Sequence, residues 1–416
     1  MQLILQGKIL NPTSLNLLFT PRIPQMTMGL HVRHHGGMPV YHKEGGGAGC
    51  HSSIHFRPHQ HLAACVISGD AEFDVNGLLD ELLDSVADSR LPKVNVHMTT
   101  MDIHSENKDV LLHTKSFTVP SSGQESNNDD NMQDSLHVLT DKPILLLHGG
   151  PGVPDYLEEM AQLLLTSKFC SQVVCFDQRG VGKSKSVKGI TKISMKLMVS
   201  DIECIRKAYG MEQVHLMGHS WGGALAQYYA MNCPERVASM ALISPTALSQ
   251  GSEWSTMEKE VFMFNVKKAG WIPFLKMGLT SLAMQVPSTS FADFGAREMM
   301  RLVMKNYYAD PATAPDPTLA FLDGVSAHAC FETKRAFLQD VSSPMMLPKS
   351  ISSRCLVTFG ERDIYGEQSK TLFSHRFDPN EIHLISNSCH LPWIDQPDEL
   401  IRLLSNFYAT QKSSEK

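Results

Sequence analysis

From residue 143 onward, short apolar runs alternate with segments of helical periodicity. The apolar runs have the length of single buried strands and lie at 143–148, 172–177, 213–217, 237–244, 354–360 and 381–386. Between them, segments such as 155–169 and 197–210 place apolar residues along one helix face. This alternation is typical of a mostly parallel sheet covered by helices on both faces. We therefore predict an α/β fold with its site at the carboxyl ends of the strands.

The alternation stops between residues 246 and 350, a stretch rich in Met, Phe and Trp. We interpret it as a helical cap inserted into the α/β core. The core is then divided into a first part, 111–245, and a second part, 351–416. Residues 1–110 precede it as an N-terminal extension that we predict to be partly disordered.

The start of the chain has an unusual composition. Residues 1–43 contain no Asp or Glu but several basic residues, which resembles an organelle transit peptide. We prefer a disordered leader. Eight histidines follow without regular ligand spacing, and we favour a low-complexity tail over a metal site: His31, His34, His35, His42, His51, His55, His59 and His61.

Composition excludes several classes of protein. The net charge of −6 and the pI of about 6.3 show no basic excess for binding nucleic acid. No apolar run approaches the roughly 18–20 residues of a membrane span. Nine cysteines without CxxC spacing indicate reduced thiols. We expect a cytoplasmic protein, or alternatively a mitochondrial or other organellar one, and its oligomeric state stays open.

The stretch "GHSWGG" at 218–223 raises the question of a nucleophile at Ser220. A G-x-S-x-G motif alone is weak, because a serine in a glycine-rich turn gives the same letters. Here it follows the predicted strand 213–217 and opens a predicted helix, which is the placement that a nucleophile elbow requires. Small flanking residues let strand and helix approach closely around a strained serine.

A serine hydroxyl needs a base, and the base needs an orienting carboxylate. In this arrangement the chain order is serine, acid, histidine. The segment "FGERDIYG" places Asp363 just past a late strand, with Glu361 as the competing acid. We choose Asp363, because Glu361 comes immediately after the glycine that ends the strand.

The histidine is expected after the last strand and before the last helix, and His390 in "NSCHLPW" meets this condition. His383 lies inside the predicted strand, and we interpret it as structural. Asp395 and Asp398 read as surface or helix-start residues.

The tetrahedral intermediate of acyl transfer needs two amide donors for its oxyanion. One is the backbone N–H of Trp221, the residue after the nucleophile. The loop "HGGPG" after the strand at 143–148 supplies the other, and we choose Gly150, with Gly149 as the alternative. His148 is expected to anchor this loop. The segment "CFDQRGVGKS" lacks the first glycine of the Walker motif, a phosphate-binding loop. We expect its Asp177 and Arg179 to hold a turn at the end of the strand.

The combination of "HGGPG", "DQRGVGKS", "GHSWGGALAQ" and a late "CHLPW" resembles the proline iminopeptidase branch of the α/β-hydrolase superfamily, over residues 136–250 and 351–408. The resemblance implies a cofactor-free serine hydrolase that releases an N-terminal residue, often proline, from small peptides or amides. It also implies cap carboxylates that bind the free α-amino group. The candidates are Glu253, Glu258, Asp293, Glu298, Asp323 and Glu332, and the sequence does not choose among them.

Two alternatives remain open. An esterase or lipase would use the same triad, with the apolar cap lining an acyl pocket. A binding or receptor protein on a hydrolase scaffold is disfavoured, because such proteins often lack a triad residue and none is missing here. A dehalogenase or epoxide hydrolase is also disfavoured, since those relatives carry an aspartate where Ser220 stands.

Overall fold

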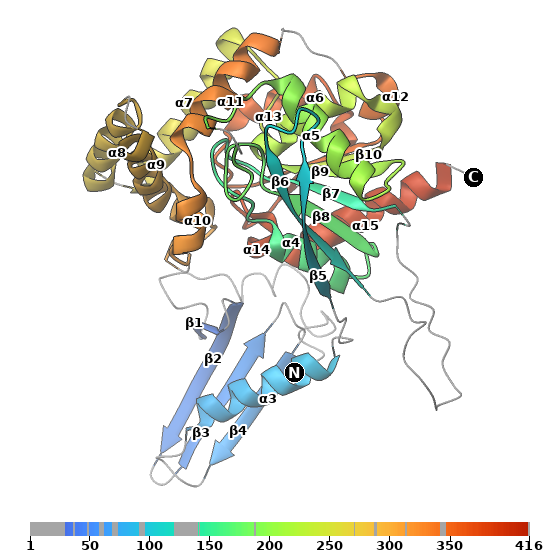
Figure 1. Cartoon of the computed structure of the whole chain (residues 1–416). Helices are drawn as coiled ribbons and strands as arrows, with labels where there is room; N and C mark the ends of the chain where they lie inside the picture. The colour runs from blue at the N-terminus through green and yellow to red at the C-terminus, as the bar shows by residue number, and fades with distance from the viewer. Residues whose placement is uncertain are drawn as a thin grey trace. The chain divides into compact units, whose positions relative to one another are not determined.

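The chain divides into two compact units, Met1–Val94 and Asn95–Lys416, each with its own sheet (Figure 1). The boundary follows Val94 rather than residue 110, where we predicted it, because a strand at His97–His104 already belongs to the second sheet. The computed structural model describes residues 30–35, 38–47, 50–57, 62–68, 74–90, 96–119, 140, 142–186, 189–269, 271–286, 289–312, 314–341 and 347–414. The first 29 residues of the predicted leader lie outside this set.

The first unit is an antiparallel sheet with one helix packed on it. Its elements are β1 (His31–His35), β2 (Met38–Gly47), β3 (Cys50–Arg57), β4 (Leu62–Ser68) and α3 (Val75–Arg90). The sequence predicted a structureless tail over the first part of this region. The structure differs because both faces of the sheet bury apolar side chains, Val40 on one face and Phe56 on the other, and α3 buries Val75 and Leu79.

Several of the histidines at 31–61 belong to this sheet. His55 is fully buried, and its Nε2 lies 2.8 Å from the side-chain oxygen of Asn76. Within the described residues, no group of three or more His, Cys, Asp or Glu is arranged to hold a metal ion.

The second unit is built on an eight-stranded sheet in the order β12-β11-β10-β9-β7-β8-β6-β5. From β12 to β8 all neighbours pair in parallel, whereas β6 and β5 are antiparallel. The strands are β5 (His97–His104), β6 (Leu111–Thr118), β7 (Ile144–Leu147), β8 (Gln172–Phe176), β9 (Val214–His219), β10 (Val237–Ile243), β11 (Cys355–Gly360) and β12 (Ile382–Ile385). The six parallel strands confirm the six apolar runs predicted from the sequence.

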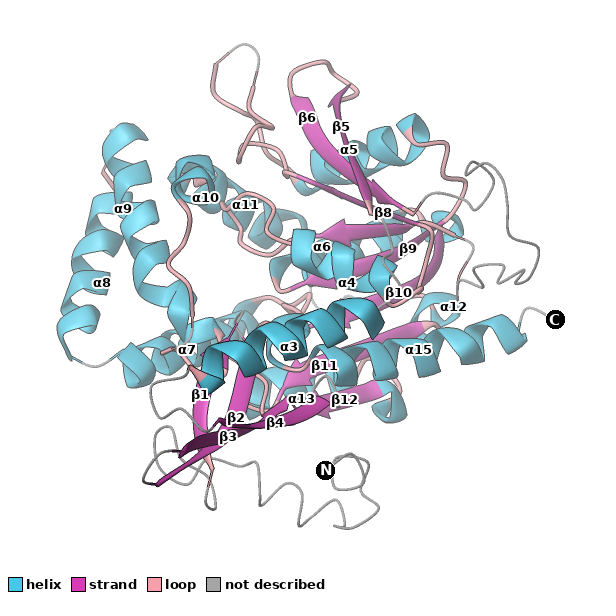
Figure 2. Cartoon of the chain, turned by 90° about the horizontal axis from the view of Figure 1, so that it is seen from below, coloured by secondary structure: helices cyan, strands magenta, loops and turns pink. Residues whose placement is uncertain are grey.

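Helices cover both faces of this sheet, as predicted (Figures 1 and 2). The core on one face is completed by α5 (Met195–Ala208), α6 (Trp221–Asn232) and α13 (Glu367–Ser374). The core on the other face is completed by α4 (Glu158–Thr166), α14 (Pro392–Asp395) and α15 (Pro397–Ser414). Because apolar side chains are buried on both faces of the sheet, the central strands appear in the sequence as uninterrupted apolar runs.

A set of helices is inserted between β10 and β11, in the stretch where the sequence predicted a helical cap. They are α7 (Gly251–Ala269), α8 (Trp271–Met284), α9 (Thr289–Val303), α10 (Leu319–Gly324), α11 (Ala327–Asp340) and the short α12 (Lys349–Ser352). In both Figure 1 and Figure 2, α8 and α9 lie side by side. Among the described residues, no helix combines the length and hydropathy needed to cross a bilayer.

Candidate active site

Ser220 stands alone between the end of β9 and the start of α6. Its backbone has φ 54° and ψ −122°, in a region that L-residues with a Cβ seldom adopt and that marks strained functional turns. The carbonyl of Ser220 accepts hydrogen bonds from the N–H groups of Gly223 and Thr246, both at 2.9 Å. These contacts hold the turn in its strained form.

The glycines beside Ser220 are required by close packing. A Cβ on Gly222 would lie 1.9 Å from the carbonyl oxygen of Leu147, and one on Gly218 would lie 2.4 Å from the carbonyl oxygen of Gly222. Any side chain at these positions would push β7, β9 and α6 apart. The glycine spacing of the motif therefore follows from the turn geometry.

The structure brings the predicted acid and base together. Asp363 follows β11, and its Oδ1 lies 2.8 Å from Nδ1 of His390, which follows β12. Both side chains are buried. The other carboxylate oxygen of Asp363 accepts the N–H of Gly360 at 3.2 Å. Glu361 is exposed and accepts the N–H of Asn387 at 3.2 Å, outside this pair.

Ser220 and His390 line the same cavity, but they are not hydrogen-bonded to each other. In the described part of the chain, the Ser220 hydroxyl has a single hydrogen-bond partner, the Tyr365 hydroxyl at 3.5 Å. Tyr365 is held by Thr246 at 2.6 Å. Burial raises the pKa of Tyr365 to about 12, so its hydroxyl stays protonated at neutral pH. Sequence reasoning did not identify this tyrosine.

The backbone N–H groups predicted to bind the oxyanion differ in whether they already have a hydrogen-bond acceptor. Trp221 is the first residue of α6, so its N–H has no acceptor within the helix. Gly150 is exposed and lines the cavity beside Ser220. Gly149, the predicted alternative, already donates its N–H to the Tyr156 hydroxyl at 3.0 Å. Of the two glycines, Gly150 is therefore the one that can face a substrate.

A chain of hydrogen bonds links the Gly149 loop to His390. The Tyr156 hydroxyl accepts from Gly149 and donates to Nδ1 of His219 at 2.6 Å. Burial lowers the pKa of His219 well below its ordinary value, so the ring is neutral and donates from Nε2 to the carbonyl oxygen of His390 at 2.8 Å. The sequence analysis missed Tyr156 and the role of His219, because Tyr156 meets His219 across 63 residues and His219 meets His390 across 171.

Further contacts fix the position of His390. Its backbone N–H donates to the carbonyl of Tyr307 at 2.9 Å, and its ring packs at 5.1 Å against Tyr307 and 5.6 Å against Tyr365. Asp395 was predicted to be a surface or helix-start residue. The structure corrects this, because its carboxylate accepts the N–H of Cys389 at 2.7 Å and that of Ala309 at 3.0 Å.

The loop predictions outside the triad agree with the structure. His148 lies 2.7 Å from the carbonyl of Gly149 and accepts the N–H of Gln178 at 3.1 Å. The Asp177 carboxylate accepts the N–H of Lys183 in its own turn and that of Asp155 in the loop after β7. Arg179 forms a bidentate ion pair with Asp201 at 2.6 and 2.7 Å.

Two adjoining cavities meet at the candidate site. The serine cavity, about 600 Å³, contains Ser220, His390 and Gly150 on its wall. The methionine cavity, about 620 Å³, is lined mainly by apolar side chains of the inserted helices. The two cavities share lining residues, among them Gly150, Tyr307 and Tyr365.

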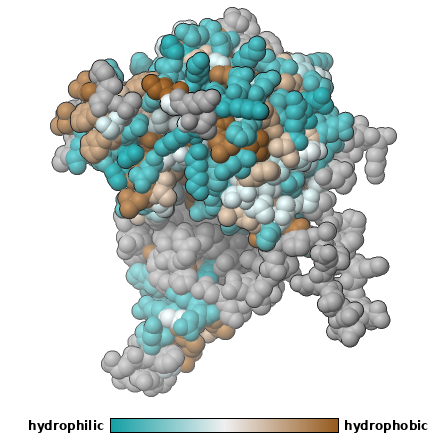
Figure 3. All heavy atoms as spheres, in the orientation of Figure 1, coloured by the Kyte–Doolittle hydropathy of each residue, from teal (hydrophilic) through white to brown (hydrophobic). Residues whose placement is uncertain are grey.

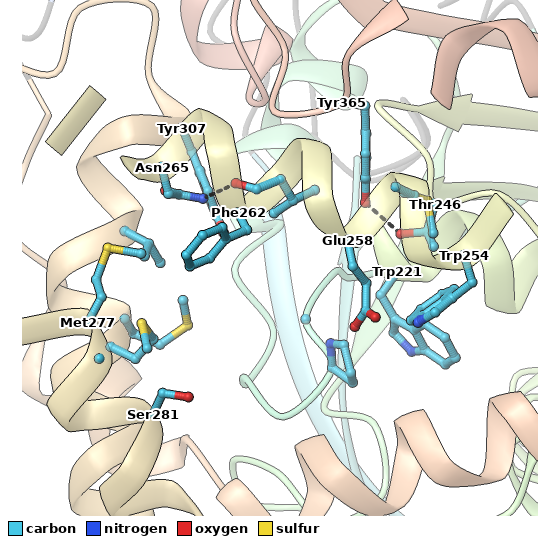
Figure 4. A pocket seen from close by; sticks show the side chains of 18 of the residues that line it. Trp221, Thr246, Trp254, Glu258, Phe262, Asn265, Met277, Ser281, Tyr307 and Tyr365 are labelled. Carbon is cyan, nitrogen blue, oxygen red and sulfur yellow. Dashed lines mark hydrogen bonds between the residues drawn. The ribbon is translucent and has the colours of Figure 1, made fainter. Parts of the chain in front are cut away.

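Figure 4 shows the methionine cavity with the Glu258 carboxylate projecting into it between Phe262 and Trp254. Glu258 is also paired with Lys334. Of the six carboxylates that the sequence offered as candidates, Glu258 is the one that lines either of these two cavities. The other five have partners elsewhere. Glu253 pairs with Arg376, Glu298 with Arg301, Asp323 with Arg297 and Glu332 with Arg335, and Asp293 accepts the N–H of Ala327.

Known proteins share this architecture. Residues 142–320 match the family model described as alpha/beta hydrolase fold. The match lies in the second unit, which has the α/β-hydrolase fold. It is 25% identical over 269 residues to a proline iminopeptidase of Heyndrickxia coagulans, covering 64% of this chain and 90% of that protein. A shorter stretch of 117 residues is 39% identical to a proline iminopeptidase of Lactobacillus delbrueckii subsp. bulgaricus, covering 27% and 38% of the two chains.

Among solved structures, the chain is similar to the proline iminopeptidase of Mycobacterium smegmatis, with a TM-score of 0.48 and 18% identity. The alignment covers 76% of this chain and all of that one. The family match and the sequence relatives identify this α/β-hydrolase as a hydrolytic enzyme, and they confirm the fold class predicted from the sequence.

Proposed function

We propose that this α/β-hydrolase is a serine hydrolase whose catalytic residues are Ser220, His390 and Asp363. The observation that carries the proposal is the buried bond between His390 and Asp363 at a cavity whose wall also holds Ser220 on its strained turn. The bond from Nδ1 to Asp363 orients the ring and leaves Nε2 to exchange protons with Ser220.

In the proposed reaction, His390 takes the proton of Ser220 as its Oγ attacks the substrate carbonyl carbon. The N–H groups of Trp221 and Gly150 stabilise the resulting oxyanion. The intermediate collapses, the bond to the leaving group breaks, and His390 protonates the departing amine. A water molecule, deprotonated by His390, then hydrolyses the acyl-enzyme and returns Ser220 to its resting form.

The proposed substrate is a small peptide or amide with a free N-terminus, of the proline type. Besides the similarity to proline iminopeptidases, the charges of the serine cavity support this choice. Four carboxylates and no Lys or Arg are among its described lining residues: Asp155, Glu158, Glu159 and Asp316. Lys115 pairs with Asp155 and Glu158, and Lys305 with Asp316, which leaves Glu159 as the carboxylate available to an ammonium group.

The test compares proline 4-nitroanilide with its N-acetylated form on purified enzyme. If the ammonium is recognised, acetylation lowers kcat/KM by about fivefold, the loss of an ion pair worth about 1 kcal/mol, because Glu159 is exposed and water screens the pair. Equal rates on both compounds would contradict an aminopeptidase, while leaving the serine mechanism intact.

A carboxylesterase is the second candidate, and the methionine cavity favours it. Met277, Val303 and Phe262 give this cavity an apolar wall suited to an acyl chain. Turnover of short-chain p-nitrophenyl esters together with no release of nitroaniline from the proline compound would establish the esterase instead.

A further inference from the structure

Helix α8 presents apolar side chains to solvent along one face. Leu275, Leu279 and Leu282 follow each other at helical spacing, and each is about two-thirds exposed (64%, 67% and 65%). The neighbouring helix α9 adds Phe291 and Phe294, each at least half exposed. Figure 3 shows apolar residues at the left edge of the view, where Figure 1 draws α8 and α9. We call these five residues the apolar face.

The other side of the same pair of helices is apolar too. Met277 of α8 and Met299 and Met300 of α9 line the methionine cavity. A helix that is apolar on all sides is normally buried, whereas α8 has one side on the cavity and the other in solvent. Leu282 belongs to both, because it lines the cavity and is largely exposed. The apolar face therefore continues into the cavity.

The charges differ between the two helices: α8 carries Lys276 and no carboxylate, whereas α9 carries the ion pair between Glu298 and Arg301 one turn beyond Phe294. Residues 261–292 contain no Asp or Glu but hold Lys267, Lys268 and Lys276, in a chain whose net charge is −6. Lys276 lies beside Leu275 and is exposed. The next acidic residue, Asp293, accepts the N–H of Ala327 at 2.7 Å. Lys268 is turned inward and donates to the carbonyls of Asn306 and Tyr308, which leaves the exposed Lys276 beside the leucines of α8. Exposed leucines with a lysine and no carboxylate on the same helix complement an anionic phospholipid surface.

We propose that the apolar face docks on an anionic lipid surface and that the methionine cavity behind it receives the apolar part of an amphiphilic molecule. In this arrangement the leucines and phenylalanines enter the boundary between headgroups and acyl chains, while Lys276 contacts phosphate groups. An apolar chain then passes from the lipid surface along Leu282 into the cavity without crossing water. The proposal goes beyond the hydrolytic chemistry and does not depend on it.

The test is co-sedimentation of the full chain with vesicles of phosphatidylcholine, with and without phosphatidylglycerol. We expect binding to the vesicles that contain phosphatidylglycerol, weakened by added salt because part of the attraction is electrostatic. Substituting Leu275→Gln together with Leu279→Gln is expected to weaken this binding by about tenfold or more, since two side chains no longer enter the membrane. Neither residue lines the serine cavity or the methionine cavity.

The matched control replaces two exposed apolar residues outside α8 and α9, Ile190→Gln with Leu384→Gln, whose exposures are 74% and 55%. Thermal unfolding checks that both variants remain folded. Wild-type binding that the control keeps and the α8 variant loses supports the proposal. Absence of vesicle binding, or equal binding of all three proteins, would overturn it. So would a dimer in solution that the α8 variant alone disrupts, because the face would then pair two copies of the chain.

Discussion

The hydroxyl of Tyr156 is a single atom on which two parts of the candidate site depend. It accepts the N–H of Gly149 at 3.0 Å and donates to His219 at 2.6 Å. Tyr156→Phe removes this atom but keeps the ring, which packs edge-on at 5.6 Å from His219 and 6.4 Å from Phe321. The substitution therefore breaks the link between the oxyanion loop and His390 with little change in packing.

The cost of the substitution can be estimated from the two groups that lose their partners. Gly149 and the ring of His219 are buried, and an unsatisfied buried polar group costs about 1–3 kcal/mol. The free energy of unfolding should then fall by roughly 2–6 kcal/mol. Because the loop that carries Gly150 is no longer fixed relative to His390, kcat/KM should fall by about 10- to 100-fold.

Urea unfolding and steady-state kinetics measure both effects. The control is Tyr228→Phe, which removes a half-buried hydroxyl that makes no hydrogen bond in the described part of the chain, and its free energy of unfolding should stay within about 0.5 kcal/mol of wild type. If Tyr156→Phe matched Tyr228→Phe in both stability and kcat/KM, the hydrogen-bond chain would have no role in the site.

Three further outcomes are expected. Asp363→Asn should lower kcat about 10⁴-fold, since the ring of His390 loses the partner that orients it. Glu361→Gln should leave kcat nearly unchanged. If instead only Glu361→Gln lowered kcat, Glu361 would be the acid of the triad. The Arg206 hydrogen bond lowers the pKa of Glu203 to about 2, so this carboxylate stabilises the fold above its unfolded pKa, and the contribution is lost as pH falls from about 4 to 2. Glu203→Gln should therefore be less stable than wild type at pH 6 and equally stable near pH 2, and a pH-independent difference would contradict this origin. The fragment 95–416 should keep kcat/KM within about twofold of the full chain, because both cavities are lined by this unit alone; loss of activity in a soluble fragment would give the first unit a part in the site.

The sequence predicted the parallel core well, because strands buried on both faces appear as uninterrupted apolar runs. It did not predict β5 and β6, in which apolar residues are mixed with His, Thr and Lys. These strands form the antiparallel edge of the sheet, where seven of the eight residues of β5 are exposed. The first unit was missed for a related reason, since β1 and β3 are rich in histidine and β2 ends in three glycines.

Local motifs likewise predicted the positions of Ser220, Asp363 and His390 at the ends of strands. The supporting contacts could not be found in this way. Tyr156 meets His219 across 63 residues, and Ser220 meets Tyr365 across 145. Such pairs depend on how loops from different strands converge, which periodicity and spacing do not specify.

The cooperation of Ser220 with His390 is the central claim, and covalent labelling with a fluorophosphonate tests it most directly. Peptide mass spectrometry of the wild-type protein should locate the adduct on Ser220. Labelling should disappear in Ser220→Ala and slow by several orders of magnitude in His390→Ala, since the hydroxyl loses its base. A folded wild-type protein that stays unlabelled, or His390→Ala that is labelled at the wild-type rate, would contradict the account.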